Sequence, residues 1–135
     1  MPEYTSPEQN PIELILMRQL ASYLVIPVFI VDSRGALAFY NEAAEKLLGR
    51  SYEENDETVL DDWARRFRPT NEDGEVVPPE ELPLVIASRE GRAAYLSPLV
   101  IMGQDEVKRR IAISAFPLRG QQGRHIGAVA MFWEV

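Results

Sequence analysis

The sequence has no cysteine and one histidine, His125. The lack of cysteine excludes disulfide bonds, metal sites built from thiolates and cysteine nucleophiles. A single histidine at the start of an expected strand, with no second type of metal ligand nearby, is typical of an exposed side chain and not of a metal ligand. We therefore predict no metal site in this chain.

Positive charge is also scarce, and no hydrophobic run is long enough to cross a bilayer. The formal net charge is −7, whereas binding to phosphates requires a basic face. The longest apolar run, residues 23–31, contains Pro27 and is far shorter than the ~20 residues of a membrane helix. Residues 1–10 lack the basic start of a signal peptide. We expect a cytoplasmic protein without nucleic-acid or membrane partners.

Recognisable catalytic groupings are missing as well. Ser88, Ser97 and Ser114 have no histidine and aspartate in the order that a catalytic triad needs. The adjacent carboxylates Asp61 and Asp62 are typical of the solvated start of a helix. The sequence has no glycine-rich loop placed between a strand and a helix, so it has no phosphate-binding loop of that kind. We predict that the chain is not an enzyme.

What is present begins with a strongly apolar N-terminal helix. A chain of 135 residues fits one domain, since domains cluster near ~100–150 residues. Residues 1–9 are polar and rich in proline, so we predict that they are disordered. Residues 10–25 predict a helix, with Asn10 as its cap and Pro11 in its first turn. The apolar arc of this helix is wider than a surface helix needs, so it must be buried on more than one side.

Residues 26–135 contain the rest of the expected elements. Turn residues and hydrophobic periodicity predict a short hairpin, then a mostly helical middle, then three strands in succession. The hairpin strands are expected at 28–31 and 36–40, the helices at 41–48, 58–67 and about 80–90, and the long strands at 91–103, 107–118 and 124–135.

The last strand is apolar on both of its faces. A sheet with one face in water would alternate between apolar and polar residues, so this sheet is predicted to be covered on both sides. Helices from the middle of the chain cover one side, and the N-terminal helix or a partner subunit covers the other. One face carries Ile126, Ala128, Ala130 and Phe132, and the other carries Gly127, Val129, Met131 and Trp133.

Three groups of residues, in this order, resemble a PAS domain over roughly residues 27–135. The first is 28–32 with Gly35, Asn41-Glu42-Ala43-Ala44 and Leu48-Gly49; the second is Asp73-Gly74, Pro78, Glu81, Pro83 and Gly91; the third is 114–118, Gly123, 127–129 and Trp133-Glu134-Val135. The resemblance, to bacterial sensor-type members, implies an α+β fold. Its five-stranded antiparallel sheet would carry helices on the concave face and the N-terminal helix on the outer face.

The resemblance also implies a sensory or protein-interaction module in signal transduction that forms a homodimer. Members often continue beyond the last strand into an effector domain, such as a kinase, cyclase, phosphatase or regulator. Here Glu134-Val135 stands at that point, so the chain is either a domain of a longer signalling protein or a stand-alone protein. Two alternatives stay open: a scaffold for dimerisation that binds no ligand and, more remotely, a small enzyme that uses the concave cavity.

Strand parity and the family pattern predict a ligand pocket on the concave face. Trp63 and Phe67 lie four residues apart on a helix and share a face. They can belong to the hydrophobic core or to a ligand pocket, because the core and the pocket of a PAS domain share walls. Small residues at three strand positions leave room, which favours a lipid-like, aromatic or planar apolar ligand. The predicted pocket residues are Phe29, Val31, Trp63, Phe67, Ile86, Leu99, Ile101, Ile111, Ile113, Ala115, Ala128, Ala130 and Phe132.

The cofactors of several PAS families do not fit this sequence. Flavin-based light sensors of the family, and members with a thioester-linked chromophore, use a cysteine that this chain lacks. Members that bind haem commonly use a histidine on the helix before the three strands, and residues 80–90 contain none. A thiol-linked flavin or chromophore is therefore excluded and haem is not expected; whether another cofactor binds stays open.

The remaining prediction is a face for dimerisation and signalling. A ligand on the inner face would change how the outer face holds the N-terminal helix or a second subunit. It can do so only if its affinity differs between the arrangement in which the outer face holds that partner and the arrangement in which it does not. Deleting the residues before Tyr23 should therefore weaken the dimer. The predicted face consists of Ile12, Ile15, Leu16, Leu20, Val129, Met131 and Trp133.

Overall fold

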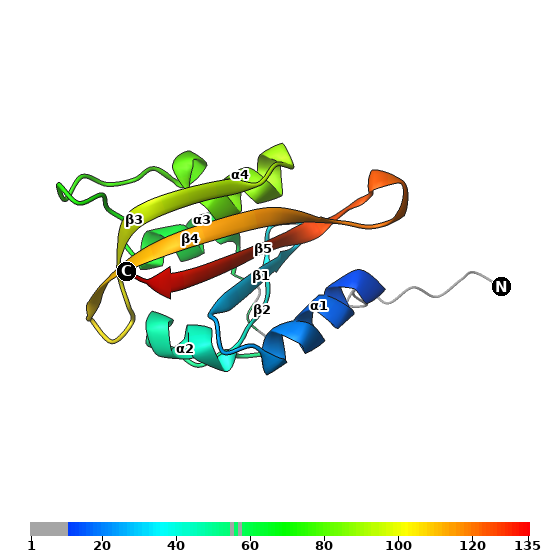
Figure 1. The fold of residues 1–135 in the computed structure, drawn as a ribbon, viewed down its shortest axis with the longest axis horizontal. Coiled ribbons are helices and arrows are strands. Elements are labelled where there is room, and N and C mark those ends of the chain that lie inside the picture. Colours follow the sequence, from blue (N-terminus) through cyan, green and yellow to red (C-terminus); the bar gives the residue numbers. More distant parts are fainter. Residues whose placement is uncertain (1–10, 55, 57) are drawn as a thin grey trace.

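Five antiparallel strands form one sheet in the order β2-β1-β5-β4-β3 in the computed structural model of the chain (Figure 1). The structure describes residues 11–54, 56 and 58–135, so the disorder predicted for 1–9 and the cap predicted at Asn10 lie outside the described residues. The strands are β1 (Val28–Asp32), β2 (Leu37–Tyr40), β3 (Ala94–Met102), β4 (Lys108–Arg119) and β5 (His125–Glu134). The predicted five-stranded α+β fold is confirmed.

The helices also follow the predicted order. They are α1 (Ile12–Tyr23), α2 (Glu42–Leu48), α3 (Leu60–Arg66) and α4 (Pro83–Glu90), with short 3-10 turns at Pro79–Glu81 and Gln121–Gly123. Within the described part of the chain, no helix is long and apolar enough to cross a membrane.

Two helix boundaries differ from the prediction. Leu82 is extended (φ −79°, ψ 132°) and separates the 3-10 turn from α4, because the ring of Pro83 disfavours helical geometry in the residue before it. The helix predicted from residue 58 begins only at Leu60, since Val59 is extended and bridges to Ala36. The later start of α3 leaves Trp63 and Phe67 in the inner cluster, as predicted.

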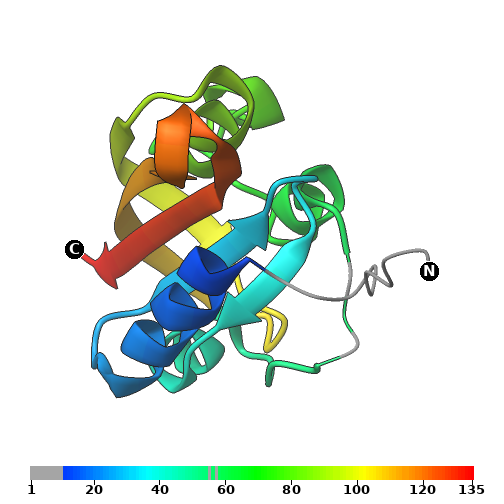
Figure 2. The ribbon, with the colours of Figure 1, turned by 90° about the vertical axis from the view of Figure 1, so that its right-hand side faces the viewer.

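The side chains of the strands alternate between two hydrophobic clusters, one on each face of the sheet. Figure 2 shows α1 and α3 on opposite sides of the strands. The inner cluster, between the sheet and α2, α3 and α4, includes Phe29, Val31, Leu99, Ile111, Ala128 and Phe132. The outer cluster, beneath α1, consists of Leu14, Ala21, Val28, Ile30, Ile126 and Val129, with half-buried neighbours such as Met17 and Leu24. The predicted cover on both faces is therefore present.

Asn41 holds the end of α1 to the rest of the domain. Its amide group donates hydrogen bonds to the carbonyl oxygens of Ala21 and Ile26, each at 2.9 Å. Its side-chain oxygen accepts from the backbone N–H of Val28 and of Ala44, each at 3.0 Å. One buried side chain thus caps α2, as predicted, and also connects the end of α1 with the start of β1.

Candidate functional site

An apolar cavity of about 100 Å³ lies between the inner face of the sheet and the helices. Such a space is small: an apolar cavity of ~150 Å³ stays dry and admits benzene. A molecule of a few heavy atoms therefore fits without rearrangement of the wall. All lining residues are apolar: Phe29, Leu48, Leu60, Trp63, Ala64, Phe67, Pro69, Leu82, Leu84, Val85, Leu99, Ile101, Ile111, Ile113, Ala130 and Phe132.

The cavity brings together most of the predicted pocket residues. Those that line it are Phe29, Trp63, Phe67, Leu99, Ile101, Ile111, Ile113, Ala130 and Phe132. The prediction included Trp63 and Phe67 of the helical wall but missed others, such as Leu60, Leu84 and Val85. The helical periodicity of these segments was visible in the sequence, but their orientation depends on where each helix begins. Ligand binding by these residues stays a prediction.

Four predicted residues do not line the cavity, and their placement is corrected here. Val31, Ala115 and Ala128 lie on the expected face but are packed inside the inner cluster. The two alanines therefore leave no room for a ligand: α4 packs against β4 and β5, and its Ala87 is fully buried in the same cluster. Ile86 is only half-buried, because α4 begins at Pro83 and turns Leu84, Val85 and Ala87 inward instead.

Trp63 is the centre of an aromatic group in the cavity wall. Its ring stacks on Phe67 at 5.2 Å between centroids, and the rings of Phe29 and Tyr40 meet it edge-on at 5.3 and 5.7 Å. The guanidinium of Arg66 lies 5.2 Å from its centroid. The buried indole Nε1 has no hydrogen-bond partner among the described residues and does not reach the cavity surface. The cavity therefore offers a ligand no hydrogen bond from its wall.

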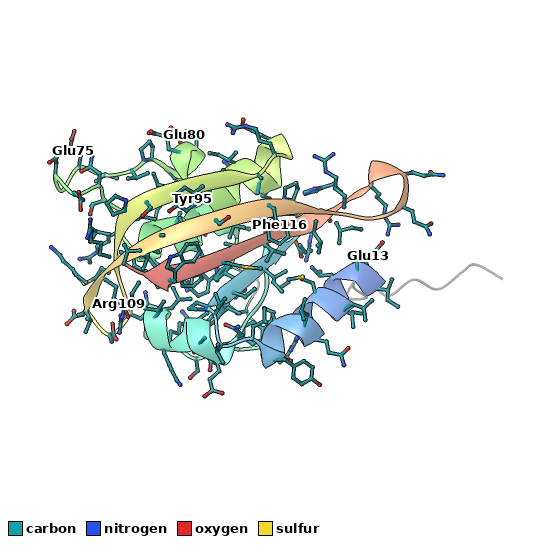
Figure 3. The ribbon with its side chains drawn as sticks, in the orientation of Figure 1. Glu13, Glu75, Glu80, Tyr95, Arg109 and Phe116 are labelled. Carbon is teal, nitrogen blue, oxygen red and sulfur yellow. The ribbon has the colours of Figure 1, made fainter. Side chains whose placement is uncertain are left out.

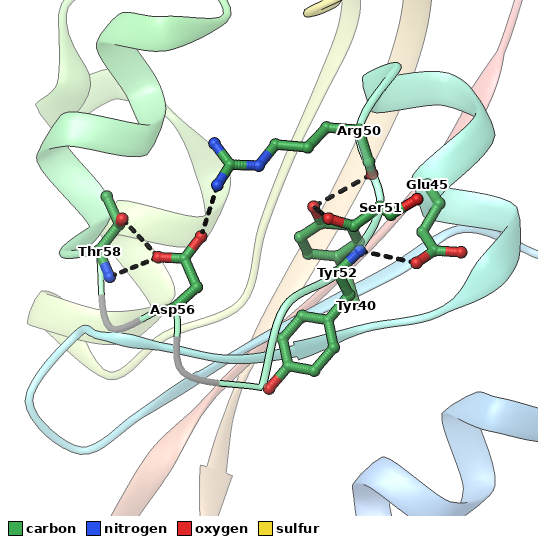
Figure 4. Close-up of polar contacts among 7 residues, drawn as sticks. All are labelled: Tyr40, Glu45, Arg50, Ser51, Tyr52, Asp56 and Thr58. Carbon is green, nitrogen blue, oxygen red and sulfur yellow. Dashed lines mark hydrogen bonds and ion pairs between the residues drawn. The ribbon is translucent and has the colours of Figure 1, made fainter.

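Tyr40 connects this aromatic group with the segment that follows α2 (Figure 4). Its single hydroxyl hydrogen is shared between the carbonyl oxygens of Arg50 and Ser51, which lie 3.1 and 3.0 Å from the hydroxyl oxygen. The N–H of Tyr52 donates to the carboxylate of Glu45 at 2.7 Å. These bonds hold the chain after α2 against the edge of the sheet formed by β2.

Burial raises the pKa of Tyr40 to about 12, and the nearby Arg50 guanidinium opposes this shift only in part. Because the folded-state pKa lies above the ordinary value of ~10, the neutral phenol stabilises the fold below pH ~10. This contribution is lost as the pH rises from ~10 toward 12. We expect the stability advantage of the wild type over Tyr40→Phe, measured by urea unfolding, to shrink over that interval. A constant difference up to pH 11.5 would contradict this titration.

The outer face divides into a part that α1 covers and a part that is open. Leu14 and Ala21 are buried in the outer cluster, whereas Ile12, Ile15, Leu16 and Leu20 are 68, 50, 56 and 52% exposed. Of the predicted strand residues in the dimer face, Val129 is wholly buried, Met131 is half-buried and Trp133 is 40% exposed. Val129 thus belongs to the intramolecular contact with α1 and is not available to a partner.

The open part of the outer face lies over β3, β4 and the end of β5 (Figure 3). Tyr95 and Phe116 are on this side of the sheet. Tyr95 is 64% exposed, and its ring lies 6.5 Å from that of Trp133. Apolar surface is thus exposed beside α1 as well as on α1 itself.

Other candidate sites find little support in the structure. Within residues 11–54, 56 and 58–135, no group of three or more acidic or histidine side chains is placed to hold a metal ion. His125 is exposed at the start of β5.

Comparison with known proteins connects this architecture with solved structures. No protein-family model and no curated protein matches the sequence. Among solved structures, the PAS domain of the fruit-fly ELK potassium channel superposes with a TM-score of 0.70 at 9% identity, covering 90% of this chain and 96% of that chain. The PAS domain of a protein from Colwellia psychrerythraea gives 0.63 at 15% identity, covering 90% and 96%.

The light-state dimer of the fungal blue-light photoreceptor Vivid gives a TM-score of 0.62 at 13% identity, covering 96% of this chain and 97% of that chain. At such identities, these similarities establish the fold. The resemblance read from the sequence is confirmed at this level: the chain has the PAS fold.

Proposed function

We propose that this chain is a sensory module of signal transduction that responds to a small apolar molecule held in its cavity. The observation that carries the proposal is the cavity of about 100 Å³ with an entirely apolar wall, inside a PAS fold. Because the wall offers no hydrogen bond or charge, a ligand would be neutral and would bind through burial of its apolar surface. Where the chain is part of a longer protein, its output would pass to an effector domain.

Xenon is a suitable first probe of this proposal, because dry apolar cavities take it up. We expect NMR signals of the methyl groups of Ile113 and Leu99 to shift in a saturable way under xenon pressure. Ala130→Leu is the matched variant, since it places three more carbon atoms against the cavity, and the shifts should be lost in it. Cavity signals that do not respond to xenon in the wild type would refute binding of a small apolar molecule.

We also propose that the exposed side of α1 forms a homodimer interface. Ile12, Leu16 and Leu20 follow one another at helical spacing and are more than half exposed, whereas the opposite side of the helix is already buried against the sheet. A contiguous apolar surface of this kind marks an interaction site. This observation also supports the second candidate function, a dimerisation scaffold without a ligand.

The double substitution Leu16→Asp and Leu20→Asp should convert the dimer to a monomer in light scattering. The fold should be retained, because substitutions of exposed residues change stability by only ~0.5 kcal/mol. Gln104→Asp is the control: it adds a charge at an exposed position of the turn between β3 and β4, away from α1, and should leave the dimer intact. A monomeric wild type, or a double variant that stays dimeric, would refute this interface.

A further inference from the structure

A continuous series of side-chain contacts connects the cavity with α1 around the β2 edge of the sheet. Its inner end is Tyr40, whose ring contacts both Phe29 and Trp63 of the cavity wall. Tyr40 meets the edge of Tyr52, with 5.4 Å between ring centroids. The outer end is Arg18 of α1, whose guanidinium lies 5.5 Å from the centroid of Tyr52. The two faces of the sheet are thus connected without a path through it.

Arg18 is the main polar attachment of α1 at this edge. Its guanidinium lies over the ring of Phe39, 4.7 Å from the centroid, and donates two hydrogen bonds to the carboxylate of Glu54. The hydrogen bond lowers the pKa of Glu54 and raises that of Arg18. An arginine held by two rings and a carboxylate in a fork geometry has little freedom to shift alone. The docking of α1, which Asn41 and the outer cluster also hold, therefore depends in part on where Tyr52 and Glu54 lie.

Tyr40 sets the position of that part of the chain. Its hydroxyl holds the carbonyl groups of Arg50 and Ser51, which directly precede Tyr52. The hydroxyl of Tyr52 donates in turn to the carbonyl oxygen of Ala38 in β2, at 2.6 Å. A displacement of the Tyr40 ring consequently moves the residues that hold Arg18.

We propose that an occupant of the cavity loosens the docking of α1 through Tyr40, residues 50–54 and Arg18. This inference rests on the proposed function, because it assumes that the cavity takes a ligand. The cavity is smaller than the ~150 Å³ that admits benzene. Trp63 and Phe29 in its wall both contact Tyr40, so an occupant that displaces either ring also affects Tyr40. Such an occupant binds more tightly to the form of the protein in which the rings of Trp63 and Phe29 have moved away from Tyr40, and it therefore favours that form.

The inference can be tested without knowing the natural ligand. Ala130→Leu fills the cavity permanently, and we expect it to speed hydrogen exchange of the α1 amides about fivefold, the lower end of typical coupling between sites. Tyr40→Phe keeps the ring but removes the hydrogen bond that the hydroxyl shares between the carbonyl groups of residues 50 and 51. In the Tyr40→Phe background, the response to Ala130→Leu should fall to less than half. Tyr95→Phe, which removes an exposed hydroxyl elsewhere, should leave the full response.

The outcomes separate the inference from the function on which it rests. Xenon that binds without changing exchange in α1 would overturn the inference alone, and a lack of xenon binding would overturn the proposed function. If Ala130→Leu speeds hydrogen exchange in α1 equally with and without Tyr40→Phe, the connection through Tyr40, residues 50–54 and Arg18 is overturned. Coupling through the strands of the sheet would then be favoured. No response in either background overturns the inference too. Should Ala130→Leu fail to fold, Ala130→Val makes the same test with a smaller side chain. All variants are compared at the same protein concentration.

Discussion

Replacing Trp63 by alanine should lower the free energy of unfolding by about 3–5 kcal/mol, the range for aromatic residues removed from a core. Trp63 is 2% exposed and packs against Phe29, Tyr40 and Phe67. It also borders a cavity, so its removal enlarges a space that the fold already leaves unfilled. Urea unfolding followed by circular dichroism measures the loss.

The other tryptophan of the chain is the matched control. Trp133 is 40% exposed, so Trp133→Ala should cost about 1 kcal/mol or less. Added indole should raise the melting temperature of the Trp63→Ala variant, because a ligand that binds only the folded state stabilises it by mass action. Equal losses in the two variants, or no effect of indole on Trp63→Ala, would contradict the role of Trp63 in the cavity wall.

The second large effect is expected for Asn41→Ala, with a loss of about 3 kcal/mol. Asn41 is 2% exposed, and its side chain pairs with backbone groups of Ala21, Ile26, Val28 and Ala44. Alanine leaves these groups without their partner, and each unpaired buried group costs ~1–3 kcal/mol where water does not replace the bond. Denaturant unfolding gives the total, and hydrogen exchange in the last turn of α1 reports the release of that helix.

Asn71→Ala is the control for this substitution. The side chain of Asn71 also accepts from two backbone N–H groups, those of Asp73 and Glu75, at 2.9 and 3.0 Å. Since this turn is exposed, water can replace the lost bonds and the cost should be about 1 kcal/mol. If Asn41→Ala costs no more than Asn71→Ala, Asn41 does not hold the domain together in the way its hydrogen bonds indicate.

The strand half of the cavity could be predicted from the sequence, whereas of the helical half only Trp63 and Phe67 were predicted. Residues such as Ile111, Ile113 and Phe132 fall on one face because side chains alternate along a strand, so each can be placed once the strand is recognised. A helical residue needs a known starting point as well. α4 begins only at Pro83, after the extended Leu82, and Ile86 is half-buried and does not line the cavity as predicted.

Contacts made by irregular segments had no signal in the sequence. Tyr52 and Glu54 follow α2 in a stretch without hydrophobic periodicity, yet they hold Arg18. Asn41 was recognised as a helix cap, because a cap lies next to its helix. Its bonds to the end of α1, 15 to 20 residues earlier, depend on how the domain closes.

The sequence by itself determined the order of elements, the apolar character of both sheet faces, the absence of thiol chemistry and the two-sided apolar surface of α1. All of these are carried by residue type and by local periodicity along the chain. Only the tertiary structure decided that Ala130 borders the cavity while Ala115 and Ala128 are packed, that α1 covers Val129, and that the cavity measures about 100 Å³. These properties arise where distant segments meet, and their packing depends on differences of single methyl groups.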